Sequence, residues 1–203
     1  MKEELWQVTK INDSFISAAQ NMQCDEELLN NLKSKERIER FYIWQNPGIT
    51  FSYKQKCPDQ MINLDHSVRV TGGGIVFHSP GDLVFSISSS NDDPQFPKKS
   101  KDKLLLISQR IQNAFQSANI VLDHHKPSIT RDYNFCQSYP TPFEIIYKGN
   151  KICGLTIRQF KKKWLIQGVI HTQPTHPIFY PFLSESNRIK STIDGHQILE
   201  KII

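Results

Sequence analysis

Three short stretches of the sequence hold residue types that can do chemistry. The first is the glycine triplet Gly72, Gly73 and Gly74, which follows closely after Arg69. Glycines allow backbone N–H groups to approach a ligand, and successive amides form a concave anion site. The triplet has neither the Gly-Lys-Ser/Thr ending of a P-loop nor the spacing of a dinucleotide fingerprint. It therefore predicts either an anion site, with Arg69 supplying charge, or a simple bend in a sheet.

The second stretch surrounds Lys151, which follows a Gly-Asn turn. A lysine at the start of a strand is usually solvated. If its ammonium group faces a pocket, it can polarise a carbonyl or hold a phosphate. Cys153, two residues further on, would lie on the same face of an extended strand. Gly154 permits a close backbone approach.

The third stretch contains Cys136, in a proline-rich connection outside the regular elements. A loop thiol near cations can act as a thiolate nucleophile, although most free cysteines only fill space in the interior. The chain has four cysteines, without a Cys-x-x-Cys pair or a histidine cluster of zinc spacing. We therefore expect reduced thiols, a cytoplasmic protein and no metal site.

The elements that must position these residues alternate between strand and helix patterns. Helical spacing of apolar residues begins near Asp13 or Ser14, either of which is a candidate N-cap. Residues 68–87 predict a hairpin-like unit with the glycine triplet at one end. The predicted strands cover residues 6–8, 40–44, 49–53, 68–71, 75–78, 83–87, 143–147, 151–157 and 164–171. The predicted helices cover residues 13–32, 103–119 and 195–203. The pattern indicates an α+β fold, in which a mixed, largely antiparallel sheet has helices packed on one side.

Length and composition favour a single globular domain. The chain has 203 residues, 38% of them hydrophobic and 22% charged. It has no run of 18 apolar residues and no apolar segment near its N-terminus, so we expect neither a membrane helix nor a secretory signal. The net charge of +5 is concentrated in basic runs at 98–103 and 161–163. We expect these runs to be solvated faces. An acidic protein is a possible partner, and nucleic acid is a distant one because regularly spaced stacking aromatics are absent.

Five stretches in a fixed order carry a resemblance to a known family. They are residues 21–29 (NMQCDEELL), 41–55, 69–78 (RVTGGGIVFH), 149–154 (GNKICG) and 167–171 (QGVIH). The set resembles the catalytic domain shared by lipoate–protein ligases, octanoyltransferases and, more distantly, biotin–protein ligases. The resemblance extends from about residue 14 to residue 171. Each motif is weak alone, and the ordered set is fairly specific.

The resemblance implies roles for these residues. The acyl chain would lie in an apolar tunnel beside the glycine triplet, and Arg69 with the triplet amides would hold its polar end. Lys151 would contact the acyl carbonyl and, in a ligase, the adenylate phosphate. A fixed ammonium group there stabilises the charge that develops when the carbonyl is attacked. Further residues expected to contact substrate or nucleotide are Thr71, His78, Asp82, Gly154 and Thr156.

Departures from the ligase pattern bear on the nucleotide. Ligases typically have H-D-x-G-N after the triplet, whereas this chain has Ser79 and Asp82 at the Asp and Asn positions. These two replacements put ATP and Mg²⁺ binding in doubt. The H-x-P-G segment is similar to the corresponding segment of octanoyltransferases. Little chain follows residue 175, so we expect one catalytic domain over residues 1–203 without a C-terminal accessory domain. Cys136 aligns with the nucleophile of one octanoyltransferase group, where it would take octanoate from acyl carrier protein as a thioester.

The leading hypothesis is a lipoate–protein ligase, which uses ATP and Mg²⁺ to form lipoyl-adenylate and attaches the lipoyl group to a lysine. The alternatives are an octanoyl or lipoyl transferase that works through a Cys136 thioester, and an inactive acyl-binding homologue. The expected partners are lipoyl-domain proteins, namely 2-oxoacid dehydrogenase subunits and the glycine cleavage H protein. Acyl carrier protein and a separate accessory subunit are further candidates. We expect no membrane and no nucleic-acid partner.

Overall fold

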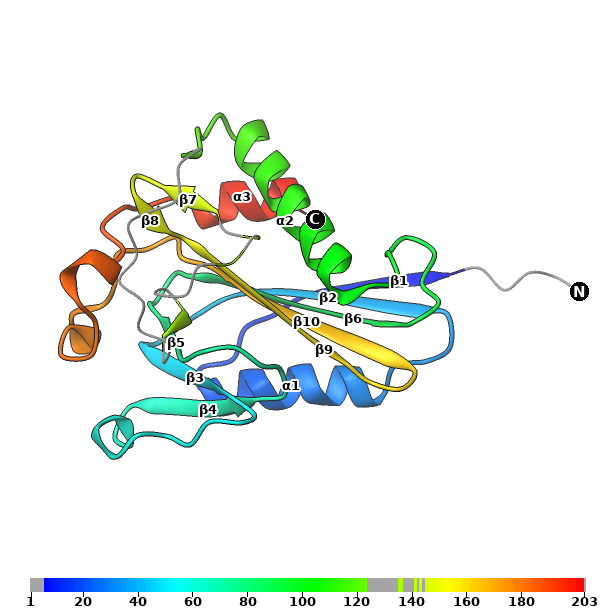
Figure 1. The fold of residues 1–203 in the computed structure, drawn as a ribbon, viewed down its shortest axis with the longest axis horizontal. Helices are drawn as coiled ribbons and strands as arrows, with labels where there is room; N and C mark the ends of the chain where they lie inside the picture. The colour runs from blue at the N-terminus through cyan, green and yellow to red at the C-terminus, as the bar shows by residue number, and fades with distance from the viewer. Residues whose placement is uncertain (1–5, 124–134, 137–140, 142, 144, 203) are drawn as a thin grey trace, which may run out of the picture.

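A mixed sheet forms the centre of the molecule (Figure 1). The computed structural model describes residues 6–123, 135–136, 141, 143 and 145–202. Within them the largest sheet has the strand order β1-β2-β6-β10-β9. Its strands are β1 (Gln7–Asn12), β2 (Glu36–Ile43), β6 (Leu83–Ser90), β10 (Lys163–Ile170) and β9 (Cys153–Gln159). β1 and β2 are parallel and the other neighbours are antiparallel, which confirms the predicted α+β class.

Two smaller sheets complete the strand structure. One has the order β4-β3-β5, and the other pairs β7 with β8. Their strands are β3 (Gly48–Ser52), β4 (Asp65–Arg69), β5 (Val76–His78), β7 (Ile146–Tyr147) and β8 (Asn150–Lys151). The glycine triplet therefore connects two strands that flank β3.

The hairpin-like unit predicted at 68–87 is wrong, because β5 and β6 belong to different sheets. The intervening turn bonds to the end of β2 instead of closing a hairpin. The Gly81 N–H donates to the carbonyl of Trp44, and the Trp44 N–H donates to the carbonyl of Asp82, each at 2.8 Å. These bonds carry the chain from the small sheet to the large one, and they place the triplet beside the central sheet.

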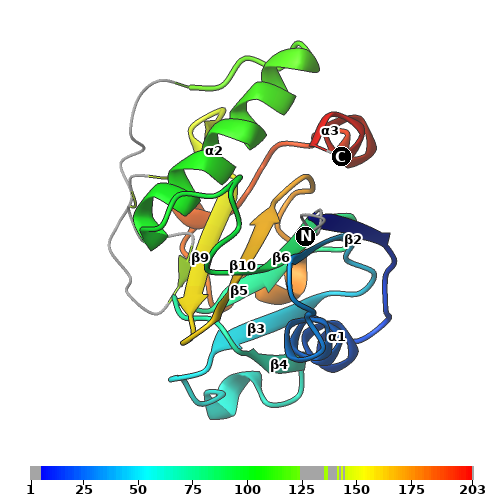
Figure 2. The same ribbon diagram turned by 90° about the vertical axis from the view of Figure 1, so that its right-hand side faces the viewer.

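The helices cover both faces of the large sheet, so the expectation that they lie on one side is wrong (Figure 2). The helices are α1 (Ala18–Asn30), α2 (Ser100–Ser117) and α3 (Gly195–Ile202), with 3-10 turns at Asp59–Met61, Pro177–Phe179 and Glu185–Asn187. α1 and the β4-β3-β5 sheet lie on one face, while α2 and α3 lie on the other. No helix of the described segments is both long and apolar enough to cross a bilayer.

α1 begins later than predicted, and its N-cap is Ser17 instead of Asp13 or Ser14. Ser17 forms a capping box with Gln20. Such a box satisfies two orphan amides of the first turn. Asp13 instead accepts a 2.6 Å bond from Arg40 Nε, which connects the segment before α1 to β2.

Alternation along the strands divides the core between the two faces. Phe41 and Phe85 belong to the apolar cluster under α2 and α3. Tyr42 and Val84, the neighbours of those residues, pack with Met22 of α1. Successive strand residues point to opposite faces. A sheet covered on both faces thus explains why β2 and β6 are buried almost throughout.

The basic run at 98–103 is only partly solvated. Lys103 is buried, and its Nζ donates to the carbonyl of Lys98 at 2.8 Å. The ammonium also lies 5.5 Å from the ring centroid of Trp164. The expectation of a fully solvated face is therefore wrong at Lys103, whose long stem covers the apolar sheet.

Candidate active site

A cavity of about 360 Å³ opens between the glycine triplet, β9, β10 and α1. Most of the predicted site residues gather around it: Arg69, Gly73, Gly74, His78, Cys136, Lys151, Gly154 and Thr156. Its apolar walls come from Met22, Val76, Val84, Leu155 and Val169. A cavity of this size with apolar walls and a few convergent polar groups is typical of a small-molecule site.

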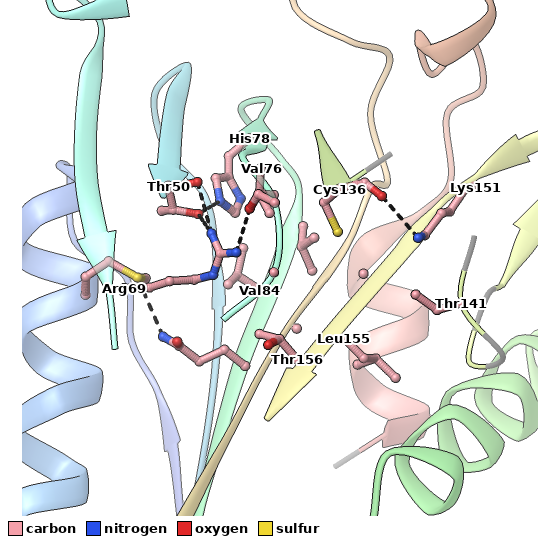
Figure 3. A pocket seen from close by; sticks show the side chains of 17 residues that line it. Thr50, Arg69, Val76, His78, Val84, Cys136, Thr141, Lys151, Leu155 and Thr156 are labelled. Carbon is pink, nitrogen blue, oxygen red and sulfur yellow. Dashed lines mark hydrogen bonds between the residues drawn. The ribbon is translucent and has the colours of Figure 1, made fainter. Parts of the chain in front are cut away.

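Cys136 and Lys151 lie together on one side of this cavity (Figure 3). The Cys136 N–H donates to the carbonyl of Ile75 at 2.8 Å, and its carbonyl accepts a 3.1 Å bond from Lys151 Nζ. These bonds hold the cysteine between Ile75, which precedes β5, and Lys151 of β8. A Cβ added to Gly154 would lie 2.9 Å from Cys136 Sγ, so the sulfur packs directly against the glycine backbone. The predicted close approach at Gly154 is therefore made by Cys136.

Arg69 holds the glycine triplet in place from within the fold. Its Nη2 donates to the carbonyls of Gly72 and Gly74 at 2.8 and 2.6 Å. Gly73 has a φ of 96°, and a Cβ there would lie 3.2 Å from the Arg69 guanidinium. Thr156 Oγ1 adds a third bond to this segment, 3.2 Å to the Gly72 carbonyl. The geometry therefore requires glycine at position 73 and gives Arg69 a positioning role.

Arg69 also interacts electrostatically with Cys136 across the cavity. Burial lowers the pKa of Arg69 to about 10, and the charge of a Cys136 thiolate opposes that decrease. Arg69 is thus a cation at neutral pH. It can stabilise negative charge that develops near the sulfur.

Thr71 does not line the cavity and instead anchors the triplet to a buried polar network. Its Oγ1 donates to Gln167 Oε1 at 2.6 Å, and Gln167 Nε2 donates to Asp25 Oδ2 at 2.7 Å. Asp25 in turn pairs with Arg40 at 2.8 Å, both fully buried. Burial raises the pKa of Asp25, whereas Arg40 and the hydrogen bonds from Ser86 and Gln167 lower it.

Gln167 is a cavity residue that sequence reasoning did not select. Its signal was available, since it is a polar residue within the apolar strand sequence WLIQGVI. Buried polar groups require partners, and Thr71 and Asp25 satisfy both ends of its amide.

His78 lines the cavity and is neutral. Its ring stacks on Trp44 with centroids 4.0 Å apart, and its Nε2 lies 3.0 Å from Thr50 Oγ1. That hydroxyl already accepts a 3.3 Å bond from Arg69, so its own proton is free to go to Nε2. Burial lowers the pKa of His78 well below the usual range, and the neighbouring His171 and Arg69 lower it further. His78 is therefore positioned as an uncharged wall residue.

Asp82 is buried outside the residues that line the cavity. Its Oδ2 accepts from the Ser79 N–H and from His171 Nδ1, both at 2.9 Å. Its Oδ1 accepts from the N–H groups of Thr172 and Gln173 at 3.0 and 3.3 Å. In this arrangement both oxygens already have protein donors, so Asp82 does not fit the expected contact with a nucleotide or Mg²⁺.

Cys153 lies on the opposite side of the sheet from the cavity, contrary to the expectation that it shares a face with Lys151. It is buried in the cluster that packs under α2 and α3. Burial raises the pKa of Cys153 to about 12, although the positive charge of Lys151 opposes the increase. A thiol in that environment stays protonated at neutral pH and is a poor nucleophile.

Comparison with protein families identifies the chain. A family model described as the lipoyl protein ligase A/B catalytic domain matches residues 17–198. The chain belongs to this family. The octanoyltransferase LipM of Bacillus cereus is 30% identical over 209 residues, which cover 94% of this chain and 74% of that protein. LipM of Oceanobacillus iheyensis is 34% identical over 148 residues, which cover 68% of this chain and 54% of that protein.

Solved structures share the fold at lower identity. Lipoate-protein ligase A bound with ATP superposes with a TM-score of 0.72 at 18% identity, covering 98% of this chain and 83% of that one. A bipartite lipoate protein ligase from Thermoplasma acidophilum, described with its E2 lipoyl domain, gives a TM-score of 0.64 at 17% identity, covering 98% and 80%. The fold is that of the ligases, while the curated sequence relatives named above are transferases. This combination favours the predicted alternative, an acyltransferase, over the ATP-dependent ligase that we ranked first.

Proposed function

We propose that this protein transfers an octanoyl group to a lysine of a lipoyl-domain protein through a thioester on Cys136. The observation that carries the proposal is the placement of Cys136 Sγ in the cavity, against Gly154 and beside Lys151. The names of the relatives from Bacillus cereus and Oceanobacillus iheyensis support octanoyl as the acyl group.

In the first step the Cys136 sulfur attacks the carbonyl of a thioester donor, for which we propose octanoyl–acyl carrier protein. A new C–S bond forms, the donor C–S bond breaks, and the cysteine proton ends on the departing carrier thiol. The oxyanion that develops between these events needs fixed positive groups. Lys151 and Arg69 supply them from opposite sides of the cavity.

In the second step the acceptor lysine amine attacks the Cys136 thioester. The amide bond forms, the C–S bond breaks, and a proton from the amine returns to the sulfur. The acyl chain remains between the apolar walls, including Met22 and Val84, in both steps. Neither step requires ATP or a metal ion.

The test is the mass of the intact protein after incubation with octanoyl–acyl carrier protein. We expect a gain of one octanoyl group in the unmodified protein and in the control Cys57→Ala, and no gain in Cys136→Ala. Cys57 is a suitable control because it is a half-buried thiol whose pKa is raised by burial and Asp59. Adding an apo lipoyl domain should then move the group to that domain. An octanoyl adduct that persists in Cys136→Ala would overturn the proposal.

The ATP-dependent ligase is the second candidate, because Lys151 lines the cavity as that chemistry also requires. It is tested in parallel with lipoate, ATP, Mg²⁺ and the same apo domain. Lipoylation of the domain with release of pyrophosphate, undiminished in Cys136→Ala, would select the ligase and reject the transferase.

A further inference from the structure

Two cations meet on one exposed tyrosine ring near the cavity. Arg158 lies 4.0 Å from the ring centroid of Tyr53, and Lys54 Nζ lies 5.4 Å from the same centroid. Arg158 also stacks on Phe160 at 5.0 Å and donates to the carbonyl of Val70 at 2.8 Å. Tyr53 is 41% exposed, so solvent reaches this group. We refer to Lys54 and Arg158 as the cationic lip.

The cationic lip stands beside the opening of the cavity. Gly73 both lines the cavity and is exposed, which marks the opening. Arg158 follows Gly154 and Thr156 at alternate positions of β9, and Thr156 and Arg158 both bond the loop that contains Gly73. Arg158 lies four positions after Gly154, the glycine that contacts the Cys136 sulfur, which corresponds to about 13 Å along the strand.

The charge of the cationic lip is not neutralised within the described part of the chain. Among those residues, no carboxylate forms an ion pair with Lys54 or Arg158. Two like charges held near one ring repel each other. The Tyr53 ring face stabilises each cation singly, and the Val70 carbonyl also stabilises Arg158, but neither cancels the shared field. An anionic partner would remove that repulsion.

We propose that the cationic lip docks an acidic surface that surrounds the target lysine of the acceptor protein. This inference rests on the proposed function. A lysine carries its amine on a four-carbon stem, so the acceptor surface must come within one side-chain length of the acylated Cys136. A folded domain at that distance covers the cationic lip, whereas a carrier that delivers its acyl group on a long arm can sit further away.

The first test separates the two half-reactions in a charge-reversal variant. Lys54→Glu is chosen because Lys54 forms no hydrogen bond with the residues that the structure describes, and Lys101→Glu is the matched control on the far face of the sheet. We expect Lys54→Glu to raise the KM for an apo lipoyl domain roughly five- to tenfold at low salt, with kcat unchanged. The difference should shrink at high salt. Acylation of Cys136 by octanoyl–acyl carrier protein, and the KM of Lys101→Glu, should not change.

Two outcomes would overturn the inference while leaving the proposed function intact. One is an unchanged acceptor KM in Lys54→Glu, provided that acyl-Cys136 forms normally. The other is slower acylation from the carrier protein with an unchanged acceptor step, which would assign the surface to the donor.

A binding titration tests the inference without relying on catalysis. Cys136→Ala protein is titrated with an apo lipoyl domain, and with a domain whose acidic residues near the target lysine are changed to amides. We expect Cys136→Ala to bind the amide domain more weakly than the acidic domain. In the double variant with Lys54→Glu, this difference between the two domains should disappear. Equal binding of both domains to Cys136→Ala would reject the cationic lip. Absence of acyl-Cys136 would reject only the proposed function.

Discussion

Two cysteines near each other in the fold occupy opposite environments. Cys136 lines the cavity, and its backbone is held by Ile75 and by Lys151. Cys153 is on the other side of β9, where it is 2% exposed and packs under α2. Burial raises the pKa of Cys153 to about 12, which removes its nucleophilic character. Residue type alone therefore does not identify the reactive thiol.

The difference arises from a change of chain direction at Ile152. Lys151 ends β8, and Cys153 begins β9, which pairs with β10. Between them the Ile152 N–H donates to Ile145 and its carbonyl accepts from His171, so the chain changes sheets at this residue. Alternation within one continuous strand would have placed Lys151 and Cys153 on the same face.

Removing each thiol separately is the most direct test of the difference between Cys136 and Cys153. Cys136→Ala should lower octanoyl transfer by on the order of 10³-fold or more, because no other group replaces the nucleophile. Cys153→Ala should keep the rate within about twofold, at a small cost in stability for the lost sulfur. Steady-state transfer to an apo lipoyl domain measures both. A large rate loss in Cys153→Ala, with an unchanged melting temperature, would contradict the division of roles.

The same comparison extends to two buried lysines. Lys151→Met should lower kcat by about 10²- to 10³-fold with little change in melting temperature, because we propose that its ammonium stabilises charge at the reacting carbonyl. Lys103→Met should leave kcat unchanged, since that ammonium lies against Trp164 and bonds the Lys98 carbonyl. Single-turnover rates and thermal melts distinguish the two. If Lys151→Met and Lys103→Met changed kcat equally, Lys151 would contribute only to the stability of the fold.

Two glycines on neighbouring strands, Gly154 and Gly168, separate an effect on the Cys136 sulfur from an effect on the core. A Cβ at Gly154 would meet Cys136 Sγ at 2.9 Å, whereas a Cβ at Gly168 would meet the Phe85 ring at 2.2 Å. Gly154→Ala should therefore displace the sulfur and lower kcat by about 10- to 100-fold. Gly168→Ala should instead destabilise the core by about 1–3 kcal/mol. Paired rate and denaturation measurements test this, and a Gly154→Ala enzyme of normal rate would show that the sulfur does not need the glycine surface.

The sequence predicted the parts of this site that depend on local pattern. The glycine triplet, Arg69, Cys136 and Lys151 were selected from residue type and order, and the structure brings Gly73, Gly74 and these three side chains to one cavity. Predicted strand positions agreed with the structure within a few residues for the strongly periodic segments, such as β10. Their binding and catalytic roles remain predictions that the proposed experiments test.

The parts that were missed depend on contacts between distant segments. Asp82 was expected to contact a ligand, but a turn between two sheets directs its oxygens to Ser79, His171 and Thr172. Gln167 has a local signal as a polar residue in an apolar strand, but its pairing with Thr71 and Asp25 joins segments that are far apart in sequence. Neither local propensity nor spacing contains information about such long-range pairing.

The pH-dependent effect of Cys153 on the free energy of unfolding is confined to alkaline pH. Its pKa is about 12 in the folded protein and near 9 when unfolded, because burial penalises the thiolate. Below pH 9 both states hold the proton and the thiol has no pH-dependent effect. Between pH 9 and 12 only the unfolded state loses it, so the free energy of unfolding falls by at most about 1.4 kcal/mol per pH unit from this group. Cys153→Ala should flatten this part of the curve in urea denaturation, whereas Cys136→Ala keeps it. If the unmodified protein, Cys153→Ala and Cys136→Ala all had the same slope, the Cys153 thiol would be accessible to water in the folded protein.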